Sequence, residues 1–187
     1  MFQRRRLLKG PLCLGFVGRL VHQKNPMLFV RVLAEVVRRR QDAHAIVVGE
    51  GPMKGKMLKL AHQLGIAQRI DWRGAAPATT GMPEMDIMVH TSFYEGQPYS
   101  LLEACVDLLP TVATNNFGSE AVFRPRLPGN IGCSPDAKDL ASIVLSISES
   151  EVLRLKQLSV LEEIAREFSA ESMISKIEAE YCALVRR

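Results

Sequence analysis

Short apolar runs alternate with longer amphipathic segments along this chain. The runs are apolar nearly throughout, which is typical of strands buried on both faces of a sheet. They predict strands at residues 12–18, 43–51, 69–74, 86–91, 110–115 and 130–134. Apolar residues at helical spacing predict helices at residues 26–40, 52–66, 98–106, 137–147, 151–168 and 170–185.

Strands that alternate with helices favour the α/β class. We expect one Rossmann-like three-layer domain over residues 1–187, with a mostly parallel sheet of about six strands and a helical carboxyl end. Residues 1–11 are expected to form a lead-in and residues 150–187 the closing helices. Ligands of such sheets bind beyond the carboxyl ends of the strands, near the point where the strand order reverses.

The composition is that of an ordinary globular protein, because 47% of the residues are hydrophobic and the mean hydropathy is +0.04. No apolar run reaches the roughly 18 to 20 residues that a membrane span requires. The amino end places basic residues before an apolar run, but Gly10 and Pro11 interrupt that run. No small-residue cleavage site follows, so we interpret this segment as a lead-in and not as a signal peptide.

The charged and sulfur-containing residues favour a cytoplasmic protein. The four cysteines have no CxxC spacing, so we expect no structural zinc. Cys13 and Cys105 lie in apolar runs, which suggests buried thiols in a reducing cytosol. The net charge of +4 comes largely from two arginine triplets, at residues 4–6 and 38–40. These are either solvated segments or a basic face for peripheral contact with anionic lipid at the inner face of a membrane. Nucleic acid is not expected as a partner, because no aromatic residues interleave with the basic ones.

Glycines, cations and acids gather just after the predicted strands. Gly18 permits a tight turn after the first strand, and Arg19 and Lys24 flank the loop that leads to the helix at Pro26. Two cations beside a helix amino end are suited to a diphosphate, although Arg19 could equally form a local salt bridge and Lys24 be solvated. The loop matches neither the Walker pattern nor the dinucleotide-binding pattern.

The segment "SFYEGQPYSLLEA", residues 92–104, places Glu95 and Glu103 eight positions apart. Pro98 suits the first turn of a helix, so Glu95 is expected in the preceding loop and Glu103 in the second turn. The free N–H groups of this helix start, with Gly96 and Gln97 leading in, suit an anion that lies between the two acids.

Several roles are open for this pair of acids. Each carboxylate could accept hydrogen bonds from the hydroxyl groups of a sugar or ribose, and an acid/base pair of a hydrolase is an alternative. A metal site is less favoured, because the nearest candidates, Asp86 and His90, lie before or within the preceding strand.

Taken together, these segments resemble the carboxyl-terminal, donor-binding domain of group-one, GT-B-fold retaining glycosyltransferases. The matching segments follow in order along most of the chain: "GFVGRLVHQKNP", "AIVVGEGPMKGKMLKLAHQLGI", "RIDWRG", "MDIMVHTSFYEGQPYSLLEA" and "PTVATN". One of them alone would be a weak signal, whereas their combination at these distances is specific.

The resemblance implies a hexosyltransferase that uses a nucleotide-diphosphate sugar of the UDP or GDP type. The acceptor would be a glycan or lipid-linked, as in polysaccharide or lipopolysaccharide synthesis, and neither a metal nor another cofactor is expected. An amino-terminal acceptor domain would complete the active site, so this domain alone should bind donor but transfer little. The alternatives are a stand-alone nucleotide-sugar-binding module without transfer activity and a nucleotide-sugar epimerase of related fold.

The resemblance also assigns roles to residues. Arg19 and Lys24 would hold the diphosphate and stabilise charge on the departing nucleotide, and Glu95 would face the transferred hexose, so these three are the candidate catalytic residues. Glu103 would bind the ribose hydroxyls. Further donor contacts are implied for Gly18, Gly49, Gly51, Arg73, Gly74, Gly96, Gln97, Pro98, Tyr99, Ser100 and Leu101.

Three positions depart from the family pattern. Leu108 stands two residues before Pro110, where the family usually has glycine, so we expect a different or strained turn. The segment at residues 115–122 is one residue shorter than usual, which leaves Gly118 and Glu120 without an assigned role. A short loop rich in Ala and Thr precedes the fourth strand, where it would alter the base pocket.

Overall fold

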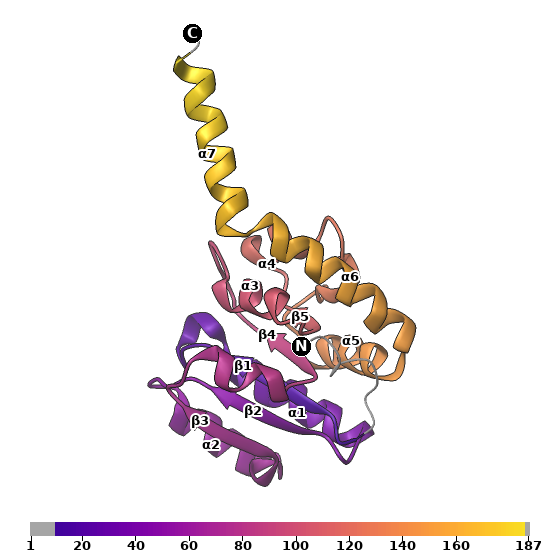
Figure 1. Ribbon diagram of the computed structural model, residues 1–187. Helices are drawn as coiled ribbons and strands as arrows, with labels where there is room; N and C mark the ends of the chain where they lie inside the picture. Colours follow the sequence, from indigo (N-terminus) through magenta and orange to yellow (C-terminus); the bar gives the residue numbers. More distant parts are fainter. Residues whose placement is uncertain (1–9, 186–187) are drawn as a thin grey trace.

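A five-stranded parallel sheet forms the centre of the computed structural model, which describes residues 10–185 (Figure 1). Its strands are β1 (Cys13–Val17), β2 (His44–Val48), β3 (Ile70–Gly74), β4 (Ile87–His90) and β5 (Thr111–Ala113). The order across the sheet is β3-β2-β1-β4-β5, and each neighbouring pair is parallel. The direction of winding reverses between β1 and β4, so these two strands form the topological switch point.

Helices cover both faces of this sheet. The α-helices are α1 (Pro26–Arg39), α2 (Lys54–Gln63), α3 (Tyr99–Val106), α4 (Phe117–Phe123), α5 (Ala137–Glu149), α6 (Glu151–Glu167) and α7 (Ala170–Val185). Short 3-10 turns are η1 (His22–Lys24), η2 (Ala67–Arg69), η3 (Ala78–Thr80), η4 (Met82–Glu84) and η5 (Pro128–Asn130). The first, second and fifth α-helices pack on one face, and the third, fourth and sixth on the other.

Alternation along the strands explains why they are apolar throughout. In β1, Leu14 and Phe16 belong to the core under α1, whereas Cys13 belongs to the core on the opposite face. Phe16 also packs against Phe29 of α1, with 5.4 Å between the ring centroids. Because successive side chains point to opposite faces, a strand covered on both sides needs apolar residues at every position.

The α/β class, the parallel sheet and the helical carboxyl end are confirmed, but the sheet has five strands and not about six. The run at residues 130–134 makes only one bridge, between Ile131 and Ala113. Gly132 N–H then donates to the Ala113 carbonyl at 2.9 Å. One residue later, Cys133 N–H donates to the Asp139 carboxylate at 2.7 Å, so the chain bonds to α5 and no longer to the sheet edge.

Leu108 adopts the left-handed conformation that the family pattern fills with glycine, with φ at 51°. Its N–H donates to the Cys105 carbonyl at 3.1 Å, and Leu109 N–H donates to the Ala104 carbonyl at 2.8 Å. These two bonds form a Schellman motif that ends α3. The expected strain is therefore present, at a cost on the order of 1 kcal/mol for a residue with a side chain.

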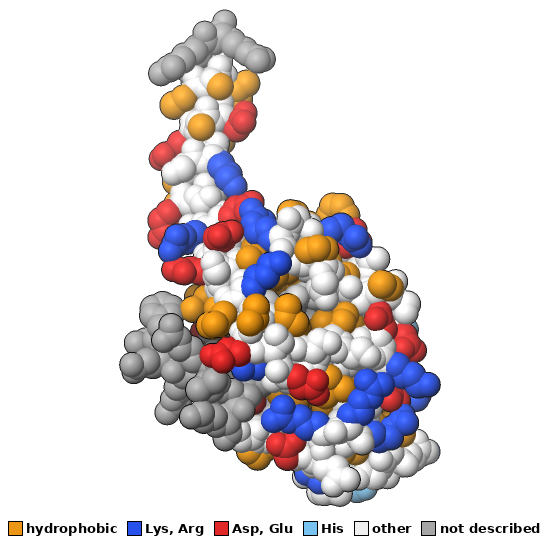
Figure 2. All heavy atoms as spheres, turned by 90° about the vertical axis from the view of Figure 1, so that its right-hand side faces the viewer, with side chains coloured by type: hydrophobic (Ala, Val, Ile, Leu, Met, Phe, Trp, Pro, Cys, Tyr) orange, Lys and Arg blue, Asp and Glu red, His pale blue; other side chains and the backbone are white. Residues whose placement is uncertain are grey.

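The two arginine triplets have different outcomes. Residues 1–9 of the expected lead-in, with the triplet at residues 4–6, lie outside the described residues. In the second triplet, Arg38 pairs with Glu35 on α1, and Arg40 pairs with Asp42 at 3.0 Å. Figure 2 shows Lys and Arg side chains interspersed with acidic ones on the face in view. Within residues 10–185, none of the helices is both long and apolar enough to cross a membrane.

Candidate functional site

Glycines join the ends of three neighbouring strands. Gly18 N–H donates to the Val48 carbonyl at 3.0 Å, and Gly49 N–H donates to the Gly74 carbonyl at 2.7 Å. Gly18 and Gly49 have φ angles of 149° and 146°, which residues with side chains rarely adopt. A Cβ atom on Gly49 would lie 1.9 Å from the Gly18 carbonyl oxygen. Only glycine therefore allows these strand ends to approach so closely.

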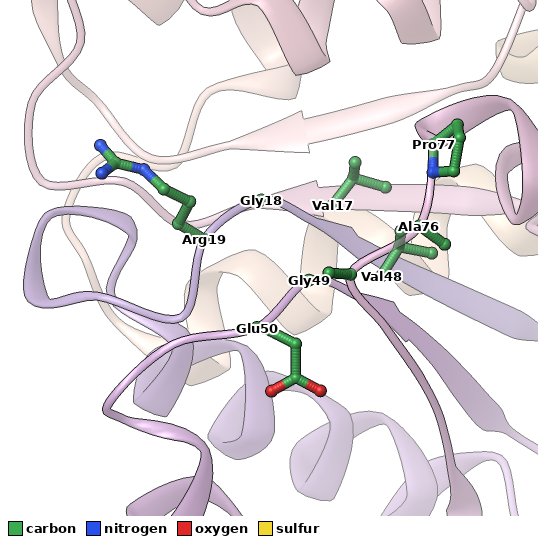
Figure 3. A pocket seen from close by; sticks show the side chains of 9 residues that line it. Val17, Gly18, Arg19, Val48, Gly49, Glu50, Ala76 and Pro77 are labelled. Atoms are coloured by element: carbon green, nitrogen blue, oxygen red, sulfur yellow. The ribbon is translucent and has the colours of Figure 1, made fainter.

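A hollow of about 470 Å³ opens at this edge of the sheet (Figure 3). This volume falls within the usual range for small-molecule sites, roughly 300 to 1,000 Å³. Arg19 is exposed at the rim and forms no ion pair with another described residue. The lining residues are Val17, Gly18, Arg19, Val48, Gly49, Glu50, Ala75, Ala76 and Pro77.

The loop after β1 is tied to the segment after β4. Phe93 N–H donates to the Gln23 carbonyl at 2.8 Å, and Gln23 Nε2 donates to the Tyr94 carbonyl at 3.1 Å. The His22 ring stacks on Phe93 with 5.0 Å between the centroids. These contacts hold the two loops together across the switch point, so the next residue of each loop is also brought into contact.

Those next residues are Lys24 and Glu95, which lie 71 positions apart and form an ion pair of 2.6 Å. The side chains are 16% and 7% exposed, respectively. Burial by itself would raise the pKa of Glu95, but hydrogen bonds from Lys24 and Ser92 and the charge of Lys24 outweigh it. The pKa of Glu95 is therefore lowered, and the carboxylate is ionised at neutral pH.

The helix after Glu95 begins as the sequence indicates. Tyr99 is the first residue of α3, so Glu95 lies in the preceding loop and Glu103 lies in the second turn. Glu103 is exposed, and the Ser100 hydroxyl is buried without a hydrogen-bond partner among the described residues. Of the other residues expected to touch a donor here, Gly96, Gln97 and Tyr99 are exposed, and Pro98 and Leu101 are buried.

Arg73 lies in β3, the outermost strand at this end of the strand order, and its guanidinium is paired with two acidic side chains. Its guanidinium donates to Asp71 at 2.8 Å and to Glu84 at 2.9 Å. Arg73 does not line the hollow, although its neighbour Gly74, with φ at 67°, forms the turn next to it. Gly51 is also outside the lining residues and supports the loop, because a Cβ atom there would lie 2.5 Å from the Leu20 carbonyl oxygen.

The residues that lead into α4, together with its first turn, support the Glu95 loop, and the sequence alone assigns them no role. Thr114 Oγ1 and Asn116 Nδ2 both donate to the Ser92 carbonyl, at 2.5 and 3.1 Å. A Cβ atom on Gly118 would lie 2.8 Å from Glu95 Cβ, so glycine permits this close approach. The asparagine before an apolar turn is a cap signal that could have revealed the helix, whereas its contact with the Glu95 loop depends on tertiary structure.

The site therefore combines the exposed Arg19, which lines the open hollow, with the half-buried Lys24–Glu95 pair and the amino end of α3, which lie outside the lining residues of that hollow. Cations and helix N–H groups suit phosphate oxygens, and carboxylates suit hydroxyl groups. Within residues 10–185, no group of three or more His, Cys, Asp or Glu side chains is placed to hold a metal ion. A phosphorylated, hydroxyl-rich ligand fits this set of groups best.

Comparison with curated proteins gives relatives whose names are those of glycosyltransferases with varied acceptors. The chain is 24% identical over 186 residues to an Escherichia coli galactosyltransferase acting on GlcNAc-diphosphoundecaprenol, which covers 96% of this chain and 47% of that protein. It is 26% identical over 165 residues to a Staphylococcus aureus poly(ribitol-phosphate) α-N-acetylglucosaminyltransferase, covering 87% and 34%. The chain thus spans about half or less of these relatives.

Solved structures show the same fold. S. aureus TarM, in a complex with fondaparinux, α-GlcNAc-glycerol and UDP, superposes with a TM-score of 0.81 at 25% identity, covering 89% of this chain and 34% of TarM. HepE from Anabaena, in a complex with UDP, gives a TM-score of 0.81 at 20% identity, covering 93% and 49%. The sequence model of the family "Glycosyl transferases group 1" matches residues 1–168. The chain belongs to the group 1 glycosyltransferases.

Proposed function

We propose that this chain is the donor-binding half of a retaining glycosyltransferase. The full protein would transfer a hexose from a nucleotide-diphosphate sugar to a glycan or lipid-linked acceptor. The observation that carries the proposal is the pairing of Lys24 with Glu95 across the switch point, beside the exposed Arg19. It supports the proposal because cations, which suit phosphate oxygens, and a carboxylate, which suits hydroxyl groups, lie at the edge where such folds bind ligands.

The roles follow from charge. Breaking the bond between the sugar and the diphosphate leaves negative charge on the departing nucleotide, and Arg19 and Lys24 can stabilise that charge without a metal. Loss of one such contact typically costs roughly 100- to 1,000-fold in rate. Glu95, kept ionised by its surroundings, accepts hydrogen bonds from the hexose, and Glu103 accepts them from the ribose. Retention of the configuration at the anomeric carbon is proposed from the family resemblance alone.

The rest of the protein's activity belongs to the same proposal. An amino-terminal domain would bind the acceptor, so the present chain alone would bind the donor but transfer little sugar. We place the enzyme in the cytoplasm, with peripheral contact at the inner face of the membrane where lipid-linked acceptors are made. The donor would be of the UDP or GDP type, with no further cofactor.

Calorimetric titration with UDP, GDP and ADP and their sugars tests donor binding. We expect one nucleotide to bind, and we expect Arg19→Ala and Lys24→Ala each to weaken that binding about 10-fold or more, because charge-assisted hydrogen bonds are lost. Arg166→Ala is the matched control, since Arg166 is exposed on α6 and pairs with Glu162 there. Absence of nucleotide binding, or equal affinity in all four proteins, would show that the donor-site assignment is wrong.

A further inference from the structure

His90 is a buried histidine directly behind the candidate catalytic carboxylate. It is the last residue of β4, and its side chain is only 3% exposed. Nε2 lies 3.4 Å from Ser92 Oγ and 3.7 Å from Glu95 Oε1. The longer distance exceeds that of a direct hydrogen bond, so the Ser92 hydroxyl is the group that connects the ring to Glu95.

The surroundings of this ring select one neutral form. Burial, and then the charge of Lys24, lower the pKa of His90 to about 4, against the opposing effect of Glu95. Lys24, from η1, and Glu95, from the loop after β4, are the charged groups that face the ring. Nδ1 has no partner among the described residues, whereas Nε2 faces a hydroxyl and a carboxylate. The single ring proton therefore belongs on Nε2.

The backbone around Ser92 is fixed, so its hydroxyl is the adjustable part of this connection. The Ser92 carbonyl is held by Thr114 and Asn116, and the far side of Glu95 is closed by Gly118. The ring N–H donates to the hydroxyl, which can then donate its own proton to Glu95. A neutral donor orients the carboxylate without adding a second positive charge, which leaves the carboxylate free to accept from another ligand.

We propose that His90 is a positioning residue, which acts through the Ser92 hydroxyl to hold the Glu95 carboxylate in place when a donor diphosphate draws Lys24 away. This inference rests on the proposed function, because it requires Glu95 to meet the transferred hexose. In the free protein, Lys24 holds Glu95 at 2.6 Å, and a diphosphate competes for that ammonium group. His90 and Ser92 then keep the carboxylate aimed at the sugar.

The test compares the sugar-dependent gain in affinity among histidine variants. UDP is titrated against UDP-glucose, UDP-galactose and UDP-N-acetylglucosamine, and GDP against GDP-mannose. In His90→Gln the side-chain amide can reach the position of Nε2, whereas in His90→Asn it reaches only the position of Nδ1. We expect the Asn variant to lose about 10-fold of the gain from the sugar with unchanged nucleotide affinity, and the Gln variant to keep most of it. His62→Asn, on the exposed side of α2, is the matched control.

Each outcome has a clear meaning. Nucleotide binding with an equal sugar-dependent gain in the wild type and His90→Asn would overturn this inference alone. No nucleotide binding by the wild type would overturn both proposals. If the Asn variant does not fold, ¹⁵N spectra of the histidine rings of the wild type decide. A proton on Nε2 that persists from pH 7 to pH 5 supports the inference, and a proton on Nδ1, or titration near pH 6.5, overturns it.

Discussion

The Glu95 carboxylate and the His90 ring are neighbouring titratable groups, and the fold keeps the first ionised and the second neutral. Glu95 is ionised because Lys24 and Ser92 outweigh its burial, and His90 is neutral because burial and the same lysine oppose its protonation. Lys24 therefore contributes to both states, so its loss would disturb both groups together.

Acid should destabilise the protein through His90. The folded pKa is about 4, below the ordinary value near 6.5, so between these values the unfolded chain binds a proton that the folded chain does not. Stability due to His90 is thus complete above pH 6.5 and is lost as the pH falls to 4, by at most about 3 kcal/mol. Urea unfolding from pH 7 to pH 4.5 measures this loss.

His90→Gln is the comparison for that measurement, because it removes the titrating ring and leaves the other ionisable groups unchanged. The variant should show a flatter dependence of unfolding free energy on pH over this interval. Identical slopes in the two proteins would contradict a lowered pKa at His90. The lowered pKa of Glu95 acts at more acidic pH, where further stability is lost as that carboxylate takes up its proton.

For single residues, the sequence predicts best those candidate site residues that follow a strand. Arg19, Lys24 and Glu95 could be selected because each lies just after an apolar run that ends at one edge of the sheet. Their roles stay a proposal. His90 and Ser92 could not be selected, since neither local spacing nor residue type indicates which side chains meet behind a carboxylate.

Among the elements, α4 connects stability to the site. Asn116 caps this helix by accepting from Ser119 N–H at 3.0 Å, and it also donates to the Ser92 carbonyl. The same side chain therefore begins the helix and fixes the Glu95 loop.

We expect Asn116→Ala to lower the unfolding free energy by about 1–2 kcal/mol and to weaken nucleotide-sugar binding. Asp136→Ala is the matched control, because Asp136 caps α5 by accepting from Lys138 and Asp139 N–H groups away from the site. It should lose similar stability with unchanged affinity. Equal binding by both variants would show that α4 does not support the site.

Element type could be predicted where apolar periodicity was strong. The five strands and six of the seven α-helices within residues 10–185 correspond to predicted segments. The short α4 was missed because its seven residues give too little periodicity. The sixth strand was wrong because "NIGCS" makes a single bridge, at Ile131, before its backbone turns to bond with α5, and that tertiary bond cannot be read from the sequence.

For the whole molecule, α7 is separate from the rest. It projects from the body as an isolated helix (Figure 1), and the family match ends before it, at residue 168. Its large apolar side chains are exposed, with exposed fractions from 47% at Ile177 to 66% at Tyr181. Such exposure contributes little to the stability of this chain.

A chain that ends at Ser169 should therefore unfold in urea with a free energy within about 0.5 kcal/mol of the full chain. A chain that ends at Glu149 is the contrasting control, because it also removes Leu161 and Ile164, which are fully buried on the sheet face under α6. That truncation should abolish cooperative unfolding. A loss above about 1 kcal/mol in the first truncation would show that α7 supports the body.

The interlocked strand ends have a consequence for how this edge can diverge. Gly49 has no room for a side chain, Gly18 has a φ angle of 149° that residues with side chains rarely adopt, and the backbone bonds of both glycines connect β1, β2 and β3. Ala75, Ala76 and Pro77 line the same hollow without holding those strands together. Substitutions in this loop can therefore change the lining of the hollow and still preserve the fold. Duplicated copies of the gene could acquire different ligand preferences there.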